Sequence, residues 1–576
     1  MPLIKTLHDF AIQPDPKKPD PANPDPPNPD PAGQADRSHY SYLFNDEAND
    51  LAAGVFDGTD DIGTISRLKE FEEATRPPID PPPAILTQLP AAYTYFCQFM
   101  NHDISAPVGS LLVDPNATPT VGIIGTADPA GLTKDWRANT KTILEHVVNE
   151  QPQPLTLCSL YGTAPDGDRN DKGVAALYEA DGKRFRLAKT SVTDPQFFRD
   201  LKVSPYHATN APDIVRTGGV PLIADLRNDG NLILSQLHLA LMLAHKKAVD
   251  ALEGRHPDPD TCFRKARQLI TLHYHWLILN DVLPRILSRS VLSRPLASWD
   301  AGRVVPGTVP MEFTTAAFRF GHSMVGRAYD FNANFGTGGR MSTTGATLDD
   351  LMRFTSRNNM GNEISPPDEQ PVQLPDHWVI DWDRLTRGPV QHEAQGTAPG
   401  TSERIDLDFA PPMLNSAGDA GVGENGGSIM FRNLLRGFHR RIPFGQKLAQ
   451  GYGLESLSAE ALRLAILGDP AKGDPPPNAY QIATAAAADQ LGILAQTPAW
   501  LYFLCEARAL EGGERVGPTA SRIIADTIVS LMCVNAASLL NHEAGHWQPA
   551  DSVLKAKDGS ALTSLGAFLS FATDRS

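Results

Sequence analysis

The sequence predicts a mainly α protein with little β structure, built as one large helical domain. Apolar residues recur at three- and four-residue spacing over several segments, which is the pattern of helices that bury one face. The clearest such segments are 232–252, 264–279 (continuing towards 287), 313–325, 429–436, 456–467 and 522–539. Alternating patterns typical of strands are few, at 121–124 and 175–186. Hydrophobic residues make up 41% of the 576 residues, which is ample for a large core.

The N-terminal region departs from this helical pattern. Residues 13–33 form a Pro-Asp repeat, and because proline lacks a backbone N–H, we expect this repeat to be extended and solvated. A second Pro-rich break at 76–83 precedes the first strong helix. We therefore predict a disordered leader at 1–35, an N-terminal extension packing on the core at 36–84, and the main domain at 85–576.

Charge and cysteine content narrow the function classes. The net charge of −16 argues against a nucleic-acid partner or an anionic membrane surface, because both attract basic faces. The five cysteines are odd in number and without CxxC spacing, which favours free thiols in a reducing compartment. The N-terminus lacks the apolar core of a signal peptide, and no apolar run reaches the roughly 18 residues of a spanning helix. We expect a cytoplasmic protein; the sequence does not decide its oligomeric state.

One segment carries an unusual pair of polar residues. A helix is predicted at 95–104, and in it Gln98 and His102 are four residues apart and share a face of an apolar, aromatic stretch. Either the two side chains satisfy each other in a core or they line a cavity where a reaction occurs. By itself the pair favours packing, because a single histidine on an apolar face is usually a core residue.

Further segments of the sequence favour the second interpretation of His102, as a residue that lines a cavity where a reaction occurs. They read PLIADLRNDGN at 221–231 (followed by a helical run to His238), AFRFGHS at 317–323, and NLLRG at 433–437 with Ile442-Pro443 beyond. Together with 497–502 and 512–518, in this order and spacing, they resemble the animal-type haem peroxidases of the peroxidase–cyclooxygenase superfamily, in its bacterial branch. The resemblance covers about residues 85 to 560 and implies that 85–576 is a helical haem peroxidase domain.

The resemblance implies a role for each of these polar residues. His102 matches the distal histidine, which moves a proton between the two oxygens of hydrogen peroxide. Arg227 matches the fixed cation that stabilises charge on the leaving oxygen, and Gln98 matches a glutamine lining the same cavity. His322 matches the proximal ligand of the haem iron, Asn433 the acceptor that orients it, and Arg319 an arginine near a haem propionate.

The implied activity is the reduction of hydrogen peroxide and, through a ferryl intermediate, the oxidation of an organic donor or a halide, as in a response to oxidative stress. The sequence does not identify the donor. Taken singly, each residue has an ordinary alternative: Arg227 a turn arginine, His322 a core histidine, Asn433 a helix cap. His238 and His245, seven apart on one helix, are interpreted as packed rather than as metal ligands.

Three positions depart from the mammalian pattern of covalently bound haem. Asn101 and Gly230 stand where those members carry ester-forming carboxylates, and Asn231 stands where myeloperoxidase carries a sulfonium-forming methionine. We therefore expect Asn101 to contact the cofactor without forming a covalent bond to it. We expect haem b, held non-covalently.

A calcium site is doubtful. Asp103 matches the family's first calcium ligand, but in the companion loop at 155–162, Thr156 and Cys158 stand where oxygen-rich residues are expected. Calcium takes six to eight hard oxygen ligands, and cysteine is a poor substitute. The residues lean against calcium, with Asp103 forming local hydrogen bonds instead.

Two alternative functions remain. The fatty-acid or metabolite dioxygenases of the same superfamily carry a radical-forming tyrosine three residues before the proximal histidine, where this chain has Arg319. The segment His542-Glu543-Ala544-Gly545-His546 fits the HExxH pattern of zinc peptidases. Gly545 inside that helix, and Pro549 soon after it, argue against the zinc alternative.

Overall fold

The computed structural model describes most of the main domain and two pieces of the preceding region. The described residues are 38–44, 61–75, 85–109, 140–149, 151, 153–162, 172–192, 195–200, 202–217, 219–293, 303–355, 373–388, 400–414, 428–542 and 547–575. The predicted leader at 1–35 and the predicted strand at 121–124 lie outside these residues, and the three-part domain division stays a prediction.

Helices dominate the described residues, so the mainly α prediction is confirmed. The longer helices are α2 (Asp61–Ala74), α3 (Ala91–Ile104), α8 (Leu232–Leu252), α9 (Pro259–Leu277), α16 (Ile429–His439), α18 (Ala459–Leu467), α19 (Ala479–Gln490), α20 (Ala499–Glu511), α21 (Pro518–Val534) and α22 (Leu565–Thr573). Shorter helices are α4 (Thr140–His146), α5 (Cys158–Tyr161), α6 (Lys172–Ala175), α7 (Pro195–Asp200), α10 (Leu283–Ile286), α11 (Arg289–Leu292), α12 (Met311–Thr315), α13 (Leu348–Arg353), α14 (Trp382–Thr386), α15 (Pro411–Leu414) and α17 (Gly445–Gly451).

The strands are short and form two-stranded pairs throughout the described residues. The pairs are β1 (His39–Ser41) with β9 (Thr308–Pro310), β2 (Leu86–Pro90) with β12 (Thr401–Glu403), β3 (Pro107–Gly109) with β4 (Val147–Asn149), β5 (Leu187–Lys189) with β6 (Pro212–Ile214), β7 (Arg216–Thr217) with β8 (Val220–Pro221), and β10 (Ala328–Tyr329) with β11 (Ala346–Thr347). Only β1–β9 is parallel.

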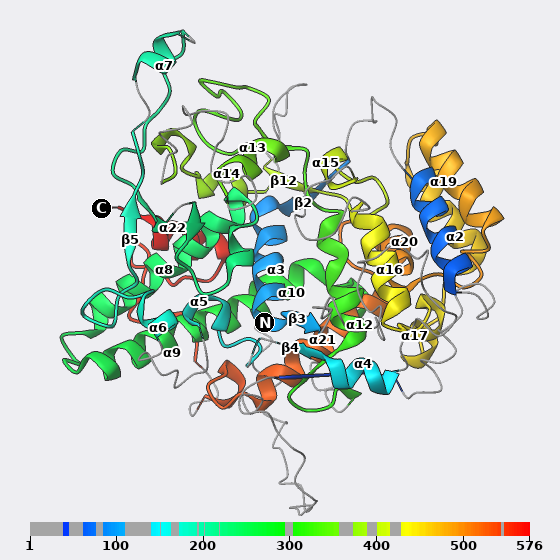
Figure 1. The fold of residues 1–576 in the computed structure, drawn as a ribbon, viewed down its shortest axis with the longest axis horizontal. Coiled ribbons are helices and arrows are strands. Elements are labelled where there is room, and N and C mark those ends of the chain that lie inside the picture. Colours follow the sequence, from blue (N-terminus) through cyan, green and yellow to red (C-terminus); the bar gives the residue numbers. More distant parts are fainter. Residues whose placement is uncertain are drawn as a thin grey trace, which may run out of the picture.

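The centre of the fold is α8, which spans the predicted residues 232–252 and is apolar on nearly every side. A helix of this kind is stable only when other elements cover it. Helices α3, α9 and α22 pack against it. In Figure 1, α3 stands near the middle of the molecule, with α8 and α9 on one side and α16 and α20 on the other.

A second group of helices surrounds α20. Helices α16, α17, α18 and α21 pack on it, and α20 and α21 also contact η7 (Ala317–His322), a short 3₁₀ helix. Helix α2, from the predicted N-terminal extension, packs against α16 and α19 at the edge of this group (Figure 1). The element η7 is therefore buried between α3, α20 and α21.

The predicted helix at 313–325 is wrong in its continuity. Helix α12 stops at Thr315, the backbone breaks at Ala316 (φ −130°, ψ −61°), and a 3₁₀ turn continues as η7. Burial of Phe313 and Phe318, whose rings stack at 4.8 Å, competes with regular helix geometry here. The spacing of the apolar residues therefore predicted which side chains are buried, but it did not predict the break in the helix at Ala316.

Two further segments differ from the sequence prediction. The strand pattern at 175–186 is a tight turn at Asp181–Gly182, with a single bridge between Tyr178 and Phe185, whose rings stack. Gly182 takes a positive φ of 66° and Asp181 accepts hydrogen bonds from the next backbone N–H groups, as turn residues do. The helix predicted at 522–539 runs instead from Pro518 to Val534, because proline suits the first helical position.

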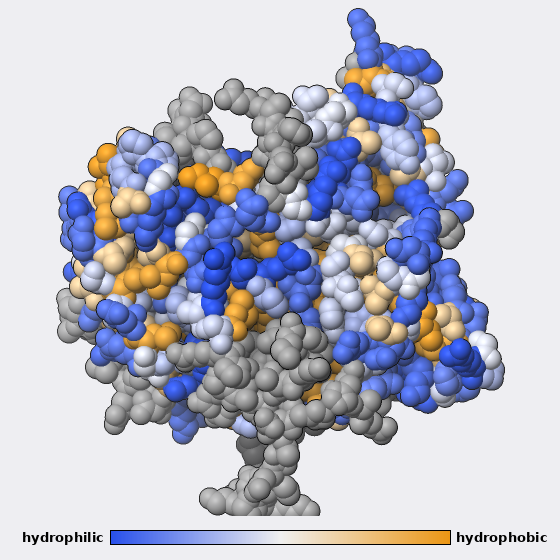
Figure 2. Space-filling model, turned by 180° about the vertical axis from the view of Figure 1, so that it is seen from behind, coloured by the Kyte–Doolittle hydropathy of each residue, from blue (hydrophilic) through white to orange (hydrophobic). Residues whose placement is uncertain are grey.

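The surface is mixed in polarity. Figure 2 shows one face on which hydrophilic residues predominate and hydrophobic ones form small scattered groups. None of the helices in the described part of the chain combines the length and apolar character of a membrane span.

A first prediction concerns the packing of α2. Phe71 is fully buried, so Phe71→Ala removes apolar contacts and leaves a cavity. We expect the free energy of unfolding to fall by about 3–5 kcal/mol, measured by denaturant titration. The exposed Glu70→Ala on the same helix is the control and should change it by less than about 0.5 kcal/mol. Equal effects of the two substitutions would contradict the packing of α2 on the core.

Candidate active site

Gln98 and His102 lie on α3 and point towards the same neighbouring segment, so the predicted shared face is present. The Oε1 atom of Gln98 accepts a hydrogen bond from Asn231 Nδ2 at 3.2 Å. The Nδ1 atom of His102 lies 2.8 Å from Asn228 Oδ1. Each side chain is therefore bonded to the turn before α8, and neither depends on the other for a partner.

That turn is η3 (Leu226–Asp229), a 3₁₀ helix with a side-chain cap at its start and, just beyond its end, the capped start of α8. At its start, Asp225 accepts a hydrogen bond from Arg227 N at 3.0 Å. Beyond its end, Asn231 caps α8 by accepting from Leu234 N at 2.9 Å. Side-chain caps of this kind satisfy the free N–H groups at helix starts. They place Arg227 and Asn228 beside the last turn of α3. We call α3 and η3 together the His102 wall.

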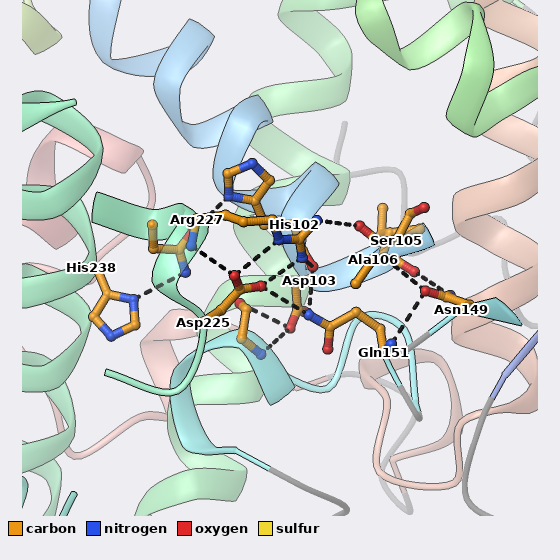
Figure 3. Close-up of polar contacts among 12 residues, drawn as sticks. His102, Asp103, Ser105, Ala106, Asn149, Gln151, Asp225, Arg227 and His238 are labelled. Atoms are coloured by element: carbon orange, nitrogen blue, oxygen red, sulfur yellow. Dashed lines mark hydrogen bonds and ion pairs between the residues drawn. The ribbon is translucent and has the colours of Figure 1, made fainter. Parts of the chain in front are cut away.

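The guanidinium of Arg227 is held from several directions (Figure 3). It donates to Asp225 through Nε (2.9 Å) and Nη2 (2.6 Å), to the carbonyl of His102 through Nη2 (2.8 Å), and to the carbonyl of Ser105 through Nη1 (2.8 Å). Gln151 ties the same group together by donating to the carbonyl of His102 (2.7 Å) and to Asp225 (3.2 Å). A guanidinium has five N–H groups, so one, on Nη1, remains for a ligand.

The environment keeps His102 neutral. Burial is the main cause that lowers its pKa, to about 4, and the positive charge of Arg227 adds to it. Asp225 and the hydrogen bond with Asn228 act in the opposite direction. Near neutral pH the imidazole is therefore uncharged and able to accept a proton.

Asn228 links His102 to a second histidine. Its Nδ2 lies 3.1 Å from Nδ1 of His238, which is on α8 and is buried. Burial lowers the pKa of His238 to about 4, and its Nε2 is buried without a hydrogen-bond partner. His245, seven residues further along α8, bonds instead to Tyr161 and to the carbonyl of Lys183.

The second wall is formed by η7 and α16, and we call it the His322 wall. Asn433, fully buried on α16, places its amide 3.0 Å from Nδ1 of His322. The Oδ1 of Asn433 is buried without a partner. Because a half-turn of the amide exchanges nitrogen and oxygen, Oδ1 can accept a hydrogen bond from Nδ1–H, which leaves Nε2 of His322 free as a ligand.

The charges of Arg319 and Arg436 act on His322, and the charge of Arg440 acts on both of these arginines. We call Arg319, Arg436 and Arg440 the arginine cluster. Arg319 donates to the carbonyl of Thr314 at 2.7 Å, and Arg440 donates to Thr315 Oγ1 at 3.2 Å, while Nε and Nη2 of Arg440 are buried without partners. Burial lowers the pKa of all three, to about 9 for Arg436, and their mutual repulsion lowers it further for Arg319 and Arg436. Among the described residues, no carboxylate forms an ion pair with any of them.

Burying several cations without a counter-charge is costly, so this cluster fits an anionic ligand. The unpartnered Asn433 Oδ1 and the partly buried His322 beside it fit an anionic ligand that carries a metal. Together the residues match the needs of haem, which carries two carboxylates and an iron that takes a histidine ligand.

A chain of hydroxyl groups joins the two walls. Tyr40 on β1 lies 2.8 Å from Ser105 Oγ at the end of α3, and Ser105 Oγ lies 2.7 Å from Thr314 Oγ1 just before η7. Burial raises the pKa of Tyr40, while the charges of Arg440 and Arg227 oppose that rise. The N-terminal strand thus contributes a side chain between His102 and the arginine cluster.

The structure brings the residues that the resemblance assigns to the haem site to these two walls and adds others, whereas Asp103 bonds to the loop at 155–159. Asn228, His238, Tyr40, Arg436 and Arg440 were not anticipated as site residues. The two arginines had a sequence signal: Arg432, Arg436 and Arg440 recur every four residues and therefore share one face of α16. Asn228 and Tyr40 had none, since their partners are far away in the sequence.

Asp103 follows His102 on α3 and holds the loop at 155–159. Its carboxylate accepts hydrogen bonds from Leu157 N (3.0 Å), Ser159 N (3.1 Å) and Ser159 Oγ (3.2 Å). Leu155 and Leu157 adopt left-handed φ values of 61° and 60°, which cost energy for residues with a side chain. N–H donors already surround Asp103, and calcium needs oxygen ligands, so this loop does not fit calcium.

The positions that bear on covalent attachment have no reactive carboxylate. Asn101 lies beside His102 on α3, and its Oδ1 is buried without a partner. Gly230 ends η3, where a Cβ atom would lie 3.2 Å from the carbonyl of Arg227. Asn231 is occupied by capping α8 and bonding Gln98.

The HExxH segment is only partly described. His542 follows a 3₁₀ turn, and 543–546 lie outside the described residues. In the part of the chain that the structure describes, no three His, Cys, Asp or Glu side chains are grouped as a metal site.

The family model and the related sequences that match this chain are those of peroxidases. Residues 191–384 match the family model described as animal haem peroxidase, a range that contains Arg227, Arg319 and His322. The chain is 26% identical over 150 residues to peroxidase mlt-7 of Caenorhabditis elegans and 27% identical over 127 residues to thyroid peroxidase of Canis lupus familiaris. These alignments cover 25% and 21% of this chain, and only 20% and 14% of the two relatives.

Two solved structures share the fold over most of their length. Peroxidase A from Dictyostelium discoideum aligns with a TM-score of 0.52 and 17% identity, covering 83% of this chain and 84% of that one. The fatty acid alpha-dioxygenase of Oryza sativa aligns with a TM-score of 0.52 and 12% identity, covering 89% and 77%. These likenesses establish the helical fold and leave the reaction open between the two classes.

A second prediction follows from the Asp103 loop. Because protein N–H groups satisfy its carboxylate, a calcium chelator should leave the thermal unfolding midpoint unchanged. Asp103→Ala, which leaves strained loop residues and buried N–H groups without a partner, should lower the free energy of unfolding by about 3 kcal/mol. Ser159→Ala, which removes one hydroxyl donor, should cost about 1 kcal/mol. A chelator-induced drop in the midpoint that calcium reverses would show that a metal holds the loop.

Proposed function

We propose that this chain, with its animal haem peroxidase match over residues 191–384, is a haem-dependent peroxidase. It reduces hydrogen peroxide and oxidises a small-molecule donor. One observation carries the proposal: two partly buried histidines from distant segments, His102 and His322, each meet an asparagine through Nδ1. In both, Nε2 is the nitrogen left for chemistry. Helix α3, which carries His102, packs against η7, which carries Arg319 and His322. The charge of Arg319 also lowers the pKa of His102, so both observations support one interior shared by the two walls.

The His322 wall is suited to hold the cofactor. His322 supplies Nε2 to the iron, and Asn433 orients the ring and accepts its second N–H. The arginine cluster supplies the positive charge that the two haem carboxylates require. Haem, when bound, supplies the redox chemistry of O–O cleavage. The absence of a carboxylate at Asn101 and Gly230 supports haem b held without covalent bonds.

The His102 wall is suited to move the proton. With its pKa near 4, His102 is neutral and takes the proton from the inner oxygen of hydrogen peroxide through Nε2. It then gives that proton to the outer oxygen, which leaves as water. Gln98, one helical turn earlier, borders the same space with its amide held by Asn231.

Arg227 stabilises the charge that develops on the leaving oxygen. Its guanidinium is fixed by Asp225 and two carbonyls, so it does not have to reorganise during the reaction. One Nη1 N–H is left to donate to the oxygen. The neighbouring carboxylate of Asp225 neutralises much of the positive charge of Arg227. Arg227 therefore stabilises the leaving oxygen mainly through one directed hydrogen bond.

The dioxygenase alternative is less well supported by the residues. Arg319 occupies the place of the radical-forming tyrosine, is partly buried, and donates to the carbonyl of Thr314. Replacing it by tyrosine would also remove one of the three charges of the arginine cluster. We therefore favour one-electron oxidation of an organic donor, with a halide as the second candidate.

A third prediction tests cofactor binding. The haem-loaded protein should show a Soret band, and His322→Gly should lose the ligand signature of that spectrum and regain it when imidazole is added. His39→Gly, at an exposed histidine, is the control and should bind haem normally. Acid–acetone should extract the haem completely from the wild-type chain. A spectrum that is the same in His322→Gly would refute the iron ligand, and haem retained by the polypeptide would refute non-covalent binding.

A fourth prediction concerns pH. The neutral form of His102 is the base, and protonation below its pKa of about 4 removes it, so the second-order rate constant for hydrogen peroxide should be constant from about pH 5.5 to 8. Below the pKa it should fall about tenfold per pH unit, measured by pH-jump stopped flow. His102→Leu should lower the rate constant by about 10²–10⁴-fold and abolish this acid limb. A limb centred near pH 6.5 would contradict the desolvated environment of His102.

A further inference from the structure

Asn228 lies between the partly buried His102 and the buried His238, a position that the proposed chemistry leaves unexplained. It is itself fully buried on η3, and both ends of its amide are used. Oδ1 lies 2.8 Å from Nδ1 of His102, and Nδ2 lies 3.1 Å from Nδ1 of His238. Figure 3 shows His102 and His238 on opposite sides of η3, with the hydrogen bonds that run between them.

We propose that Asn228 and His238 are positioning residues that set the tautomer of His102, with the proton on Nδ1 and the lone pair on Nε2. The role of the unprotonated Nε2 as a catalytic base rests on the proposed peroxidase function. The tautomer itself is a property of the polypeptide and is tested separately.

The chemistry of an amide makes the two contacts depend on each other. A carboxamide has one acceptor end and one donor end. When Nδ2 donates to His238, Oδ1 is left facing His102 and can only accept, so Nδ1 of His102 must carry the proton. A neutral imidazole has one N–H, and Nε2 of His102 is then unprotonated.

His238 keeps the amide of Asn228 in this orientation. Its ring is neutral, and its only hydrogen-bond contact among the described residues is through Nδ1. As long as Nδ1 of His238 accepts, Asn228 cannot turn over without losing this bond or moving a proton within His238. The edge of Phe99 packs against the His238 ring at 6.2 Å between centroids, which restricts rotation of that ring.

An asparagine also suits this position better than an aspartate. An amide oxygen fixes the tautomer without favouring the charged imidazolium, whereas a carboxylate would stabilise the charge and raise the pKa of His102. The charged groups that act on His102 are Arg227 and Asp225 from η3 and Arg319 from η7. The Asp225 carboxylate is taken up by Arg227 and Gln151, so it does not compete for the imidazole N–H.

The tautomer is measured directly by NMR of the full-length protein without haem, labelled with ¹⁵N-histidine. The His102 signals are assigned by their loss in His102→Gln. We expect a protonated Nδ1 and an unprotonated Nε2 in the wild type. In Asn228→Leu, which keeps the size but removes the acceptor, we expect Nε2–H, the tautomer that a free imidazole side chain prefers.

Two further variants separate positioning from general damage. His238→Phe should leave Asn228 free to turn over and give a mixture of His102 tautomers. His245→Phe removes another buried neutral histidine from the same helix, which bonds elsewhere, and should leave the His102 signals unchanged. If Asn228→Leu does not fold, Asn228→Asp keeps the acceptor and the size, and should retain Nδ1–H while raising the pKa of His102 by more than one unit.

With haem bound, Asn228→Leu should lower the rate constant for hydrogen peroxide by about 10–100-fold, the usual effect of losing a group that orients a catalytic histidine. Asn228→Asp should shift the acid limb of the pH profile upward.

An Nε2–H tautomer in the wild type, or a His102 tautomer unchanged in both Asn228→Leu and His238→Phe, would overturn the inference even if the protein is a peroxidase. An Nδ1–H tautomer that depends on Asn228 would sustain it even if the protein binds no haem.

Discussion

The carboxylate of Asp225 accepts hydrogen bonds from the backbone and guanidinium of Arg227 and from Gln151, and the whole His102 wall depends on these contacts. As the cap of η3, it starts the turn; as an ion-pair partner, it directs Arg227 onto the carbonyl groups at the end of α3. Without it, the short turn would lose its cap and the arginine its orientation. Asn228 follows Arg227 by one residue, so its contact with His102 depends on the same carboxylate.

Desolvation then gives the two kinds of basic side chain opposite roles. A histidine that is removed from water favours its neutral form, which has lost the proton. The pKa of His102 is therefore lowered to about 4, and its neutral ring can act as a base. An arginine does not lose its proton near neutral pH, so the arginine cluster remains charged and needs an anion. The same low-polarity interior therefore provides a neutral proton acceptor on one wall and an anion site on the other.

Much of the fold could be predicted from the sequence, because the spacing of apolar residues along the chain reflects which side chains are buried. The bounds of α8 agree with the prediction, and Gln98 and His102 share a face of α3 as their four-residue spacing requires. The break at Ala316 was not readable, because it depends on how α12 and η7 pack against α20 and α21. The same is true of the loop at 155–159, whose left-handed residues are stable only because Asp103 supplies an acceptor.

The sequence by itself determined the helical class, because the spacing of apolar residues along the chain reflects burial. The candidate residues on both walls, and the meaning of the missing carboxylates at Asn101 and Gly230, came from the resemblance of its motifs to a known family. Only the tertiary structure decided that Asn228 is the partner of His102, across 126 positions, and of His238. The pairing of Asn433 with His322 was implied by the resemblance, and the structure places the two side chains 3.0 Å apart. Hydrogen bonds form between neighbours in space, and in a buried site the choice of neighbour sets the charge, the tautomer and the free atom of each side chain.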